Sequence, residues 1–322
     1  MTCQPADRGK VVSYLLSALR GDTPERYQAA IADFSIELRG RGFCLEEVEA
    51  EELDWLLAEK VVDLVEAADD SSVGLGRAGL LIAAVSKARP HAKFRVAWKA
   101  LDVWRTKQPP QQAAAFTPEM AFACGIRCIL VYGQIEAGVS IILCFCALLR
   151  ASECLRLRRC DVLDLGSSIV IVIGVAKRGL EQKVSLSHPR VVLFLREYVI
   201  RTASRGPGER LVQLSYGKLQ HWLQRSVREL GFPGHWTSHG LRRGGATELF
   251  RKNISLNAIA QQGRWLSERS MREYLRRGEV AQLRLAGSIA PATWKEAERL
   301  AAIGERVWAI KDGIDGGRLE GL

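Results

Sequence analysis

Four side chains that can take part in chemistry lie close together in residues 235–277. His239 and Arg242 stand three residues apart, so on a helix they share one face. Trp265 and Tyr274 follow on later short segments. A phenol is a poor nucleophile at neutral pH because its unperturbed pKa is about 10, and fixed positive charge beside it is one way to activate it. The stretch therefore suggests a tyrosine nucleophile among cations, although each residue alone fits an ordinary basic helical hairpin.

Consecutive short elements must position these four side chains. Helical spacing, a Ser cap and a Gly-containing break divide the stretch into separate segments. The predicted elements are, in order, a helix that ends at Lys252–Asn253, a helix capped by Ser255 that runs through Gln262, a break at Gly263–Trp265, a segment from Ser267 that contains Tyr274, and a short apolar helix over 280–285.

The order and spacing of these residues resemble a known family. His239-x-x-Arg242, then Gly263-x-Trp265, then Tyr274 nine residues later, resembles the C-terminal active-site half of the tyrosine recombinases, the phage integrase family. Upstream, an Arg followed three residues later by a Glu, in the run ALLRASECL, resembles the first arginine motif of that family. The whole chain fills the family pattern Arg, Lys, His, Arg, His-or-Trp, Tyr in order, with Trp in the fifth place.

That resemblance implies a reaction and a role for each side chain. The tyrosine attacks a DNA phosphate and forms a 3′-phosphotyrosyl bond, and the two arginines neutralise the charge that develops in the transition state. The lysine protonates the departing 5′ oxygen, the histidine assists at the phenol or binds a phosphate oxygen, and the tryptophan packs at the same oxygens. No metal, cofactor or ATP is implied, because the covalent link stores the energy. The implied catalytic set is Arg150, Lys177, His239, Arg242, Trp265 and Tyr274, with Glu153 as a supporting or merely structural group.

A β-hairpin is predicted between the two arginine motifs. Residues 168–175 are rich in β-branched side chains, and 183–186 form a second strand after a Gly-containing turn. The family carries its catalytic lysine on such a hairpin, and Lys177 is the best match, with Lys183 as the alternative. A charged surface turn without catalytic role is the competing interpretation.

The distribution of charge indicates a polyanionic partner. Residues 150–290 contain 25 Lys/Arg and 11 Asp/Glu, a net charge of +14, whereas the whole chain carries +10. Such a basic segment is the usual electrostatic footprint of nucleic acid binding, and the expected partner is double-stranded DNA. A solvated helix face explains the basic cluster near residue 99 equally well. The predicted DNA contacts are Lys93, Arg95, Lys99, Arg105, Arg178, Arg225, Arg243 and Arg264.

The predicted fold class is mainly α, with an N-terminal helical bundle and a mixed α/β catalytic domain that contains a small antiparallel hairpin or sheet. Residues 1–109 are predicted to form a helical domain that resembles the core-binding domain of the family, with a loop at 71–74. A Pro- and Gln-containing linker follows at 107–112. The catalytic domain is predicted over 110–290, and 291–322 is predicted to be a C-terminal helix and tail, which relatives often exchange between protomers.

The cysteines and the apolar runs bear on location. The eight cysteines show no C-x-x-C spacing, and we interpret them as reduced thiols of an intracellular protein, in the cytoplasm, nucleoid or nucleus depending on the host. A zinc site that uses His235 and His239 is a weak alternative. The N-terminus lacks a signal peptide, and the longest apolar run, 137–149, is too short to span a membrane.

Two other functions remain open at this level. A type IB topoisomerase-like enzyme would use the same chemistry to relax DNA without exchanging partners. A catalytically silent DNA-binding protein derived from a mobile element would keep the fold alone. For a recombinase we expect self-association, with a tetramer on paired DNA sites.

Overall fold

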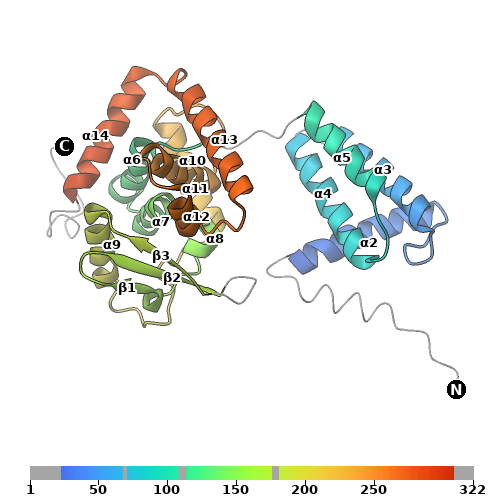
Figure 1. Ribbon diagram of the computed structural model, residues 1–322, viewed down its shortest axis with the longest axis horizontal. Helices are drawn as coiled ribbons and strands as arrows, with labels where there is room; N and C mark the ends of the chain where they lie inside the picture. The colour runs from blue at the N-terminus through green and yellow to red at the C-terminus, as the bar shows by residue number, and fades with distance from the viewer. Residues whose placement is uncertain (1–22, 68–70, 109–113, 176–180, 308–322) are drawn as a thin grey trace. The chain divides into compact units, whose positions relative to one another are not determined.

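The computed structural model describes residues 23–67, 71–108, 114–175 and 181–307 (Figure 1). The chain divides into two compact units, Met1–Gln111 and Gln112–Leu322. The described part of the first unit is helical, and the second unit combines helices with one small antiparallel sheet. The predicted fold class is therefore confirmed. Most of the predicted linker lies outside the described residues.

Helices pack around a single apolar core in the described part of the N-terminal unit. Leu53, Leu57, Ile82 and Leu101 are fully buried there. The predicted loop at 71–74 is wrong, because a helix already begins at Ser71 and burial of the following side chains offsets the low helix propensity of its glycines. The helices are α2 (Thr23–Gly40), α3 (Ala50–Glu66), α4 (Ser71–Ala88) and α5 (Arg95–Lys107).

A buried carboxylate fixes the start of α5. The side chain of Asp54, on α3, accepts the backbone N–H groups of Val96 and Ala97, each at 2.9 Å. These N–H groups belong to the first turn of α5, where a helix has no internal acceptors of its own. Asp54 therefore serves as a cap supplied by another helix, and it orients the basic N-terminal end of α5.

A second apolar core lies in the C-terminal unit, where the small sheet lies at one side of the helices (Figure 1). The sheet has the order β1-β2-β3 and is antiparallel throughout. The elements of the C-terminal unit are α6 (Pro118–Leu130), α7 (Ile135–Cys146), α8 (Ala151–Cys154), the 3-10 turn η1 (Arg159–Asp161), β1 (Val162–Asp164), β2 (Ile169–Val175), β3 (Glu181–Leu186), α9 (Pro189–Arg201), α10 (Tyr216–Glu229), α11 (Ser238–Arg251), α12 (Leu256–Gly263), α13 (Glu268–Ala286) and α14 (Pro291–Val307).

The predicted hairpin is present as β2 and β3. Ile169 pairs with Leu186 at one end, and the register shifts between Val172 and Gly174. The third strand, β1, was not predicted, because three residues are too few to show a period. The turn at 176–180, with the predicted Lys177 and Arg178, lies outside the described residues.

Glycines on α11 let it approach neighbouring backbone closely. A Cβ at Gly240 or Gly244 would overlap carbonyl oxygens of the segment 114–116, and a Cβ at Gly245 would overlap the carbonyl oxygen of Phe145 at the end of α7. Only glycine fits these three positions without moving the backbone. The backbone of the helix that carries His239 and Arg242 therefore lies in direct contact with the backbone of neighbouring segments.

The helix that carries Tyr274 is longer than predicted. Instead of a short segment followed by a separate helix over 280–285, α13 is one continuous helix. Gly278 lies where α13 crosses α11, and a Cβ there would overlap the side-chain oxygen of Thr247. Gln282 then donates from its Nε2 to the carbonyl of Phe116 at 2.8 Å. Glycine at 278 thus permits the close crossing, and the hydrogen bond joins the second half of α13 to the segment before α6.

The last described helix, α14, packs on α6 of the same chain. Ala297 and Leu300 are buried, and Trp294 and Ile303 pack against the core. Exchange of residues 291–322 between protomers stays a prediction. No helix within the described ranges is both long and apolar enough to cross a bilayer.

The close approach of α11 gives a first prediction. Gly244→Ala should lower the free energy of unfolding by about 1–3 kcal/mol, the usual cost of overpacking, because the added methyl group meets the backbone of Phe116. Gly217→Ala on α10 is the matched control, since nothing lies within 4 Å of its Cβ position. Chemical denaturation should show the control unchanged or up to about 1 kcal/mol more stable. Equal losses in both variants would contradict the packing account.

Candidate active site

Arg242 lies at the centre of the motif residues and is almost fully buried, with 2% of its side chain exposed. Its guanidinium donates to the carbonyl oxygens of Leu148, at 2.7 Å, and Gly263. It also stacks over the ring of Trp265, 4.7 Å from the centroid. Arg242 thus joins three segments that are far apart in the sequence: the end of α7, α11 and the turn after α12.

The carbonyl of Leu148 is turned toward the arginines by an uncommon backbone conformation. Leu148 has a φ of +50°, in the left-handed region, and its side chain is buried. This conformation costs an L-residue with a Cβ about 1–2 kcal/mol. In return, the same oxygen accepts from Arg242 and, at 3.0 Å, from Arg264. Local strain is therefore stored at the point where the chain enters α8.

Arg150 stands at the N-cap of α8 and faces solvent, with 53% of its side chain exposed. Glu153 accepts both the backbone N–H of Arg150, at 2.7 Å, and its guanidinium, at 2.6 Å. The Arg-x-x-Glu spacing thus lets Glu153 bind both the backbone and the side chain of Arg150, which fixes Arg150 at the start of the helix. Arg150 is the exposed guanidinium of the site and Arg242 the buried one.

Arg264 is a buried part of the same cluster. Its guanidinium donates to Glu153 at 2.6 Å and to the carbonyl of Leu148, and only 3% of its side chain is exposed. The sequence predicts a DNA contact for Arg264, whereas in the structure its guanidinium is directed to Glu153 and to the carbonyl of Leu148. Glu153 therefore lies between two arginines, and Arg242 is a third at 3.7 Å.

Tyr274 lies beside the cluster, on α13. Its ring centroid is 5.1 Å from that of Trp265 and 5.3 Å from that of His239. Its hydroxyl points to the backbone carbonyl of His239, at 3.5 Å. The guanidinium of Arg243 covers the ring at 5.2 Å from the centroid. The phenol, the imidazole and the indole therefore share one aromatic cluster next to Arg242.

The position of Trp265 depends on Gly263. A Cβ at Gly263 would overlap the six-membered ring of that indole. The backbone then turns through Arg264, whose φ is +55°. Glycine at 263 and the turn at 264 together fold the indole back over Arg242, which explains the Gly-x-Trp spacing physically.

Charge and burial set the protonation of the site at rest. Burial, and then the positive charges of Arg264 and Arg150, lower the pKa of Arg242 to about 10, so it stays charged at neutral pH. Burial, and then Arg243 and Arg242, lower the pKa of His239 to about 4, so its imidazole is neutral. Burial raises the pKa of the Tyr274 phenol, and the arginines only partly offset this. Nearby cations therefore do not ionise the phenol at rest, contrary to the simplest expectation from the sequence.

The carboxylate of Glu153 is held in its charged form. Burial by itself would raise its pKa, but Arg264 and the hydrogen bonds from Arg150 outweigh burial and lower the pKa below its usual range. The cluster therefore keeps one negative and three positive groups at neutral pH, and it has an excess of positive charge.

The other predicted site residues lie elsewhere. Lys183 is exposed on β3, opposite Val172. Arg225 pairs with Glu229 at 2.8 Å and stacks over Tyr132 and Trp222. Arg243 is 8% exposed and its guanidinium lies over the ring of Tyr274, and its contact with DNA stays a prediction. In the N-terminal unit, Lys93, Arg95 and Lys99 line a shallow groove with Trp98, whereas Arg105, also exposed, pairs with Asp102.

Sequence reasoning missed two backbone groups of the site, the carbonyls of Leu148 and Gly263. A left-handed leucine carries no signal in the sequence, whereas Gly263 was visible only as a break. The alternative zinc site gains no support, since no group of three His, Cys, Asp or Glu side chains gathers in the part of the chain that the structure describes.

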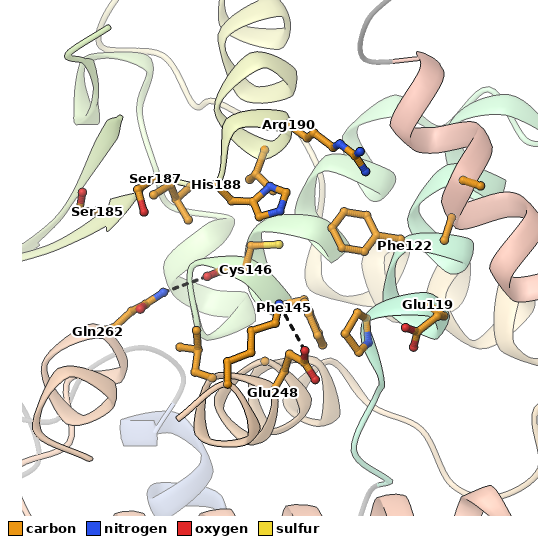
Figure 2. Close-up of a pocket in the computed structure, with 18 of the residues that line it drawn as sticks. Glu119, Phe122, Phe145, Cys146, Ser185, Ser187, His188, Arg190, Glu248 and Gln262 are labelled. Carbon is orange, nitrogen blue, oxygen red and sulfur yellow. Dashed lines mark hydrogen bonds and ion pairs between the residues drawn. The ribbon is translucent and has the colours of Figure 1, made fainter. Parts of the chain in front are cut away.

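A separate cavity of about 470 Å³ lies near the C-terminal end of α7 (Figure 2). Phe122, Phe145 and His188 line it, and α14 of the same chain forms one wall through Ala301 and its neighbours. Across it, Gln262 donates to the carbonyl of Cys146 at 3.0 Å. Of the predicted catalytic residues that the structure describes, Arg150, His239, Arg242, Trp265 and Tyr274, none lines this cavity.

The fold and the site together define a class of protein, a helical domain in which a tyrosine lies beside arginines that converge from distant segments. Residues 131–279 match the phage integrase family, and every described residue of the cluster lies in that span. Residues 131–279 therefore form a domain of the phage integrase family.

Several solved structures share this fold. The XerH site-specific recombinase bound to a palindromic difH substrate is 16% identical over 83% of this chain and 79% of its own, with a TM-score of 0.57. The Tn1549 transposon integrase in complex with transposon right end DNA is 15% identical, over 85% and 99%, with a TM-score of 0.56. A lambda integrase dimer bound to a core site is 15% identical over 85% of this chain and 95% of its own, with a TM-score of 0.56. Among curated proteins, none matches this sequence.

At such identities the structural likeness shows the fold, and the family match adds the domain type. Together they support a site-specific recombinase or integrase, an enzyme that acts as a DNA strand transferase. They favour neither the topoisomerase-like enzyme nor the silent DNA-binding protein.

The electrostatics of the site give a second prediction. In the DNA-free protein, His239 should titrate near pH 4 by NMR, and Arg243→Gln should raise that pKa toward the unperturbed value of about 6.5, because it removes a neighbouring positive charge. Arg272→Gln, an exposed arginine of α13 paired with Glu268, is the matched control and should leave the titration unchanged.

The same shift has a consequence for stability. The folded pKa of His239 lies below the unfolded one, so the unfolded state binds more protons between pH 4 and 6.5. The contribution of the neutral imidazole to the free energy of unfolding is therefore complete above pH 6.5 and decreases as the pH falls toward 4. His239→Gln should remove this part of the pH dependence in denaturation curves. If His239 of the wild-type protein titrated near pH 6.5, both the expected NMR titration and the expected pH dependence of stability would be contradicted.

Proposed function

We propose that this chain is a site-specific DNA recombinase that cleaves and rejoins strands through a 3′-phosphotyrosyl intermediate on Tyr274, without metal or ATP. One observation carries the proposal. Arg150, Arg242, Trp265 and Tyr274 come from four separate segments and meet in one cluster that carries excess positive charge. A phosphate diester of DNA is the anion that such a cluster fits.

In the proposed first step, the Tyr274 oxygen attacks the scissile phosphorus. A bond forms between the phenol oxygen and phosphorus, and the bond from phosphorus to the 5′ oxygen breaks. The phenol proton leaves as the new bond forms, since burial keeps the phenol protonated at rest. The departing 5′ oxygen takes up a proton and becomes a free hydroxyl.

The arginines would bind the non-bridging oxygens during this step. Arg150 and Arg242 offer charge from the exposed and the buried side of the cluster, and a planar guanidinium can donate two hydrogen bonds to a phosphate. Because the guanidiniums are already in position before the reaction, they need not be rearranged when the pentacoordinate transition state forms. This arrangement supplies electrostatic stabilisation from side chains alone.

The proton transfers are assigned to His239 and a lysine. His239 is neutral at pH 7 and its ring adjoins that of Tyr274, so it can accept the phenol proton. A base with so low a pKa is weak, but a bound phosphate would offset the arginine charges and raise that pKa. Lys177 is the proposed acid for the 5′ oxygen, with Lys183 as the alternative.

The second half of the reaction reverses the first. A 5′-hydroxyl of a partner strand attacks the phosphotyrosyl bond and releases Tyr274, which gives strand exchange. We propose that the protein assembles on paired double-stranded DNA sites as a tetramer, and that residues 291–322 take part in contacts between protomers. Acting on DNA would place it inside a cell, in the cytoplasm, nucleoid or nucleus according to the host.

The decisive experiment is trapping of the covalent adduct. Wild-type protein incubated with genomic DNA of its source, then denatured, should yield DNA fragments attached to protein, and Tyr274→Phe should yield none because it lacks the nucleophilic oxygen. Tyr216→Phe, an exposed tyrosine on α10, is the control and should behave as wild type. Adduct formation by Tyr274→Phe would sink the assignment, and sequencing the attached DNA would identify the cleavage site.

Binding should depend steeply on salt, because cationic side chains release counterions from DNA. The logarithm of the binding constant is expected to fall with the logarithm of salt concentration by about 0.9 for each phosphate contact. Replacing Lys93, Arg95 and Lys99 with Gln should reduce that slope, whereas Arg299→Gln on α14, paired with Glu296, should not. An affinity independent of salt would contradict the proposed partner.

A further inference from the structure

Arg264 occupies a position that suits glycine better than arginine. It follows the last residue of α12, and its φ of +55° lies in the left-handed region. Such a helix end is most often occupied by glycine, since a Cβ makes this conformation unfavourable. The turn by itself therefore gives no reason for an arginine.

The side chain of Arg264 adds a second cost. It is 3% exposed, and its Nε is buried with no hydrogen-bond partner among the residues that the structure describes. A buried donor without an acceptor is unfavourable, and so is a buried guanidinium close to Arg242. Since neither the backbone nor burial favours arginine here, its contacts must explain it.

Those contacts lead to Arg150 through Glu153. One carboxylate oxygen of Glu153 binds the guanidinium of Arg150, at 2.6 Å. The other accepts from Arg264, also at 2.6 Å, and from the backbone N–H of Arg150. The charge of Glu153 is thus shared between two guanidiniums. Without Arg264, Glu153 would be left to pair mainly with Arg150 and would cancel its charge.

We propose that Arg264 is a positioning residue that holds Glu153 in place, so that Glu153 orients Arg150 for the scissile phosphate while leaving it a net positive charge. Arg264 acts through Glu153 and touches no DNA itself. The inference deepens the proposed function and rests on it for the identity of the phosphate.

The test compares two substitutions at this position. Arg264→Gly keeps and even favours the left-handed turn, so it should fold, but it removes the guanidinium. Arg264→Lys keeps a positive charge that can reach Glu153. With a synthetic duplex that contains the mapped cleavage site, the rate of adduct formation at saturating DNA should fall about 10- to 100-fold in Arg264→Gly, the size of one lost charge-assisted hydrogen bond. Arg264→Lys should recover part of the rate.

A second substrate separates positioning from a merely structural role. In a duplex with a methylphosphonate at the scissile position, one non-bridging oxygen is replaced by a methyl group, so the centre carries no charge for Arg150 to neutralise. The deficit of Arg264→Gly relative to wild type should shrink on this substrate, as should that of Arg150→Ala. Arg272→Gln removes one surface charge from the same domain, an exposed arginine paired with Glu268, and should match wild type on both duplexes.

Two results would overturn the proposal. In the first, Arg264→Gly cleaves as fast as wild type, which would mean that the position needs only a turn. In the second, its deficit is the same on both substrates, which would mean that it does not act through the charge at phosphorus.

An activity-independent measurement keeps this inference distinct from the proposed function. If wild type forms no adduct, the proposed function fails, and NMR of the arginine Nε–H groups in the DNA-free protein judges Arg264 instead. Arg264→Gly should shift the Arg150 signal in the same direction as Glu153→Gln does. An unchanged Arg150 signal would overturn the positioning role.

Discussion

Repulsion among buried guanidiniums is the constraint on which the rest of the C-terminal unit depends. Arg242 and Arg264 are nearly excluded from water, and Arg150 adjoins them through Glu153. One carboxylate cannot balance three positive charges in a medium less polar than water. Backbone carbonyls of Leu148 and Gly263 supply the remaining stabilisation. Even with the charge of Glu153, the cluster therefore keeps an excess of positive charge.

The backbone around the arginine cluster contains locally unfavourable features that bring the arginines and their acceptors together. Leu148 adopts a left-handed backbone that turns its carbonyl inward, and Gly240, Gly244 and Gly245 forgo side chains so that α11 can lie against neighbouring backbone. Gly278 does the same where α13 crosses α11. Each of these features weakens a local element relative to an ideal one. Their common result is that distant segments approach closely enough for one arginine to bond two of them.

Without substrate, the site carries positive charge but its tyrosine is not ionised. Burial leaves the Tyr274 phenol protonated despite the cations around it, and burial together with those cations keeps His239 neutral. An anionic phosphate would change both conditions at once, because it offsets the arginine charges and brings the electrophile to the phenol. The proposed nucleophile would therefore be activated mainly by its substrate, which limits reaction with other groups.

Local chemistry in the sequence determined much of this protein. β-Branched residues predicted β2, the cap at Ser255 predicted the start of α12, and the ordered spacing from Arg150 to Tyr274 indicated the family. Such signals are encoded in neighbouring residues, so they can be read without coordinates. Tertiary structure alone decided that Arg264 turns inward to Glu153, that α13 runs unbroken through Gly278, and that burial outweighs positive charge at Tyr274. A side chain's direction and protonation depend on acceptors, charges and solvent exclusion supplied by segments far away in the chain, and no local pattern contains them.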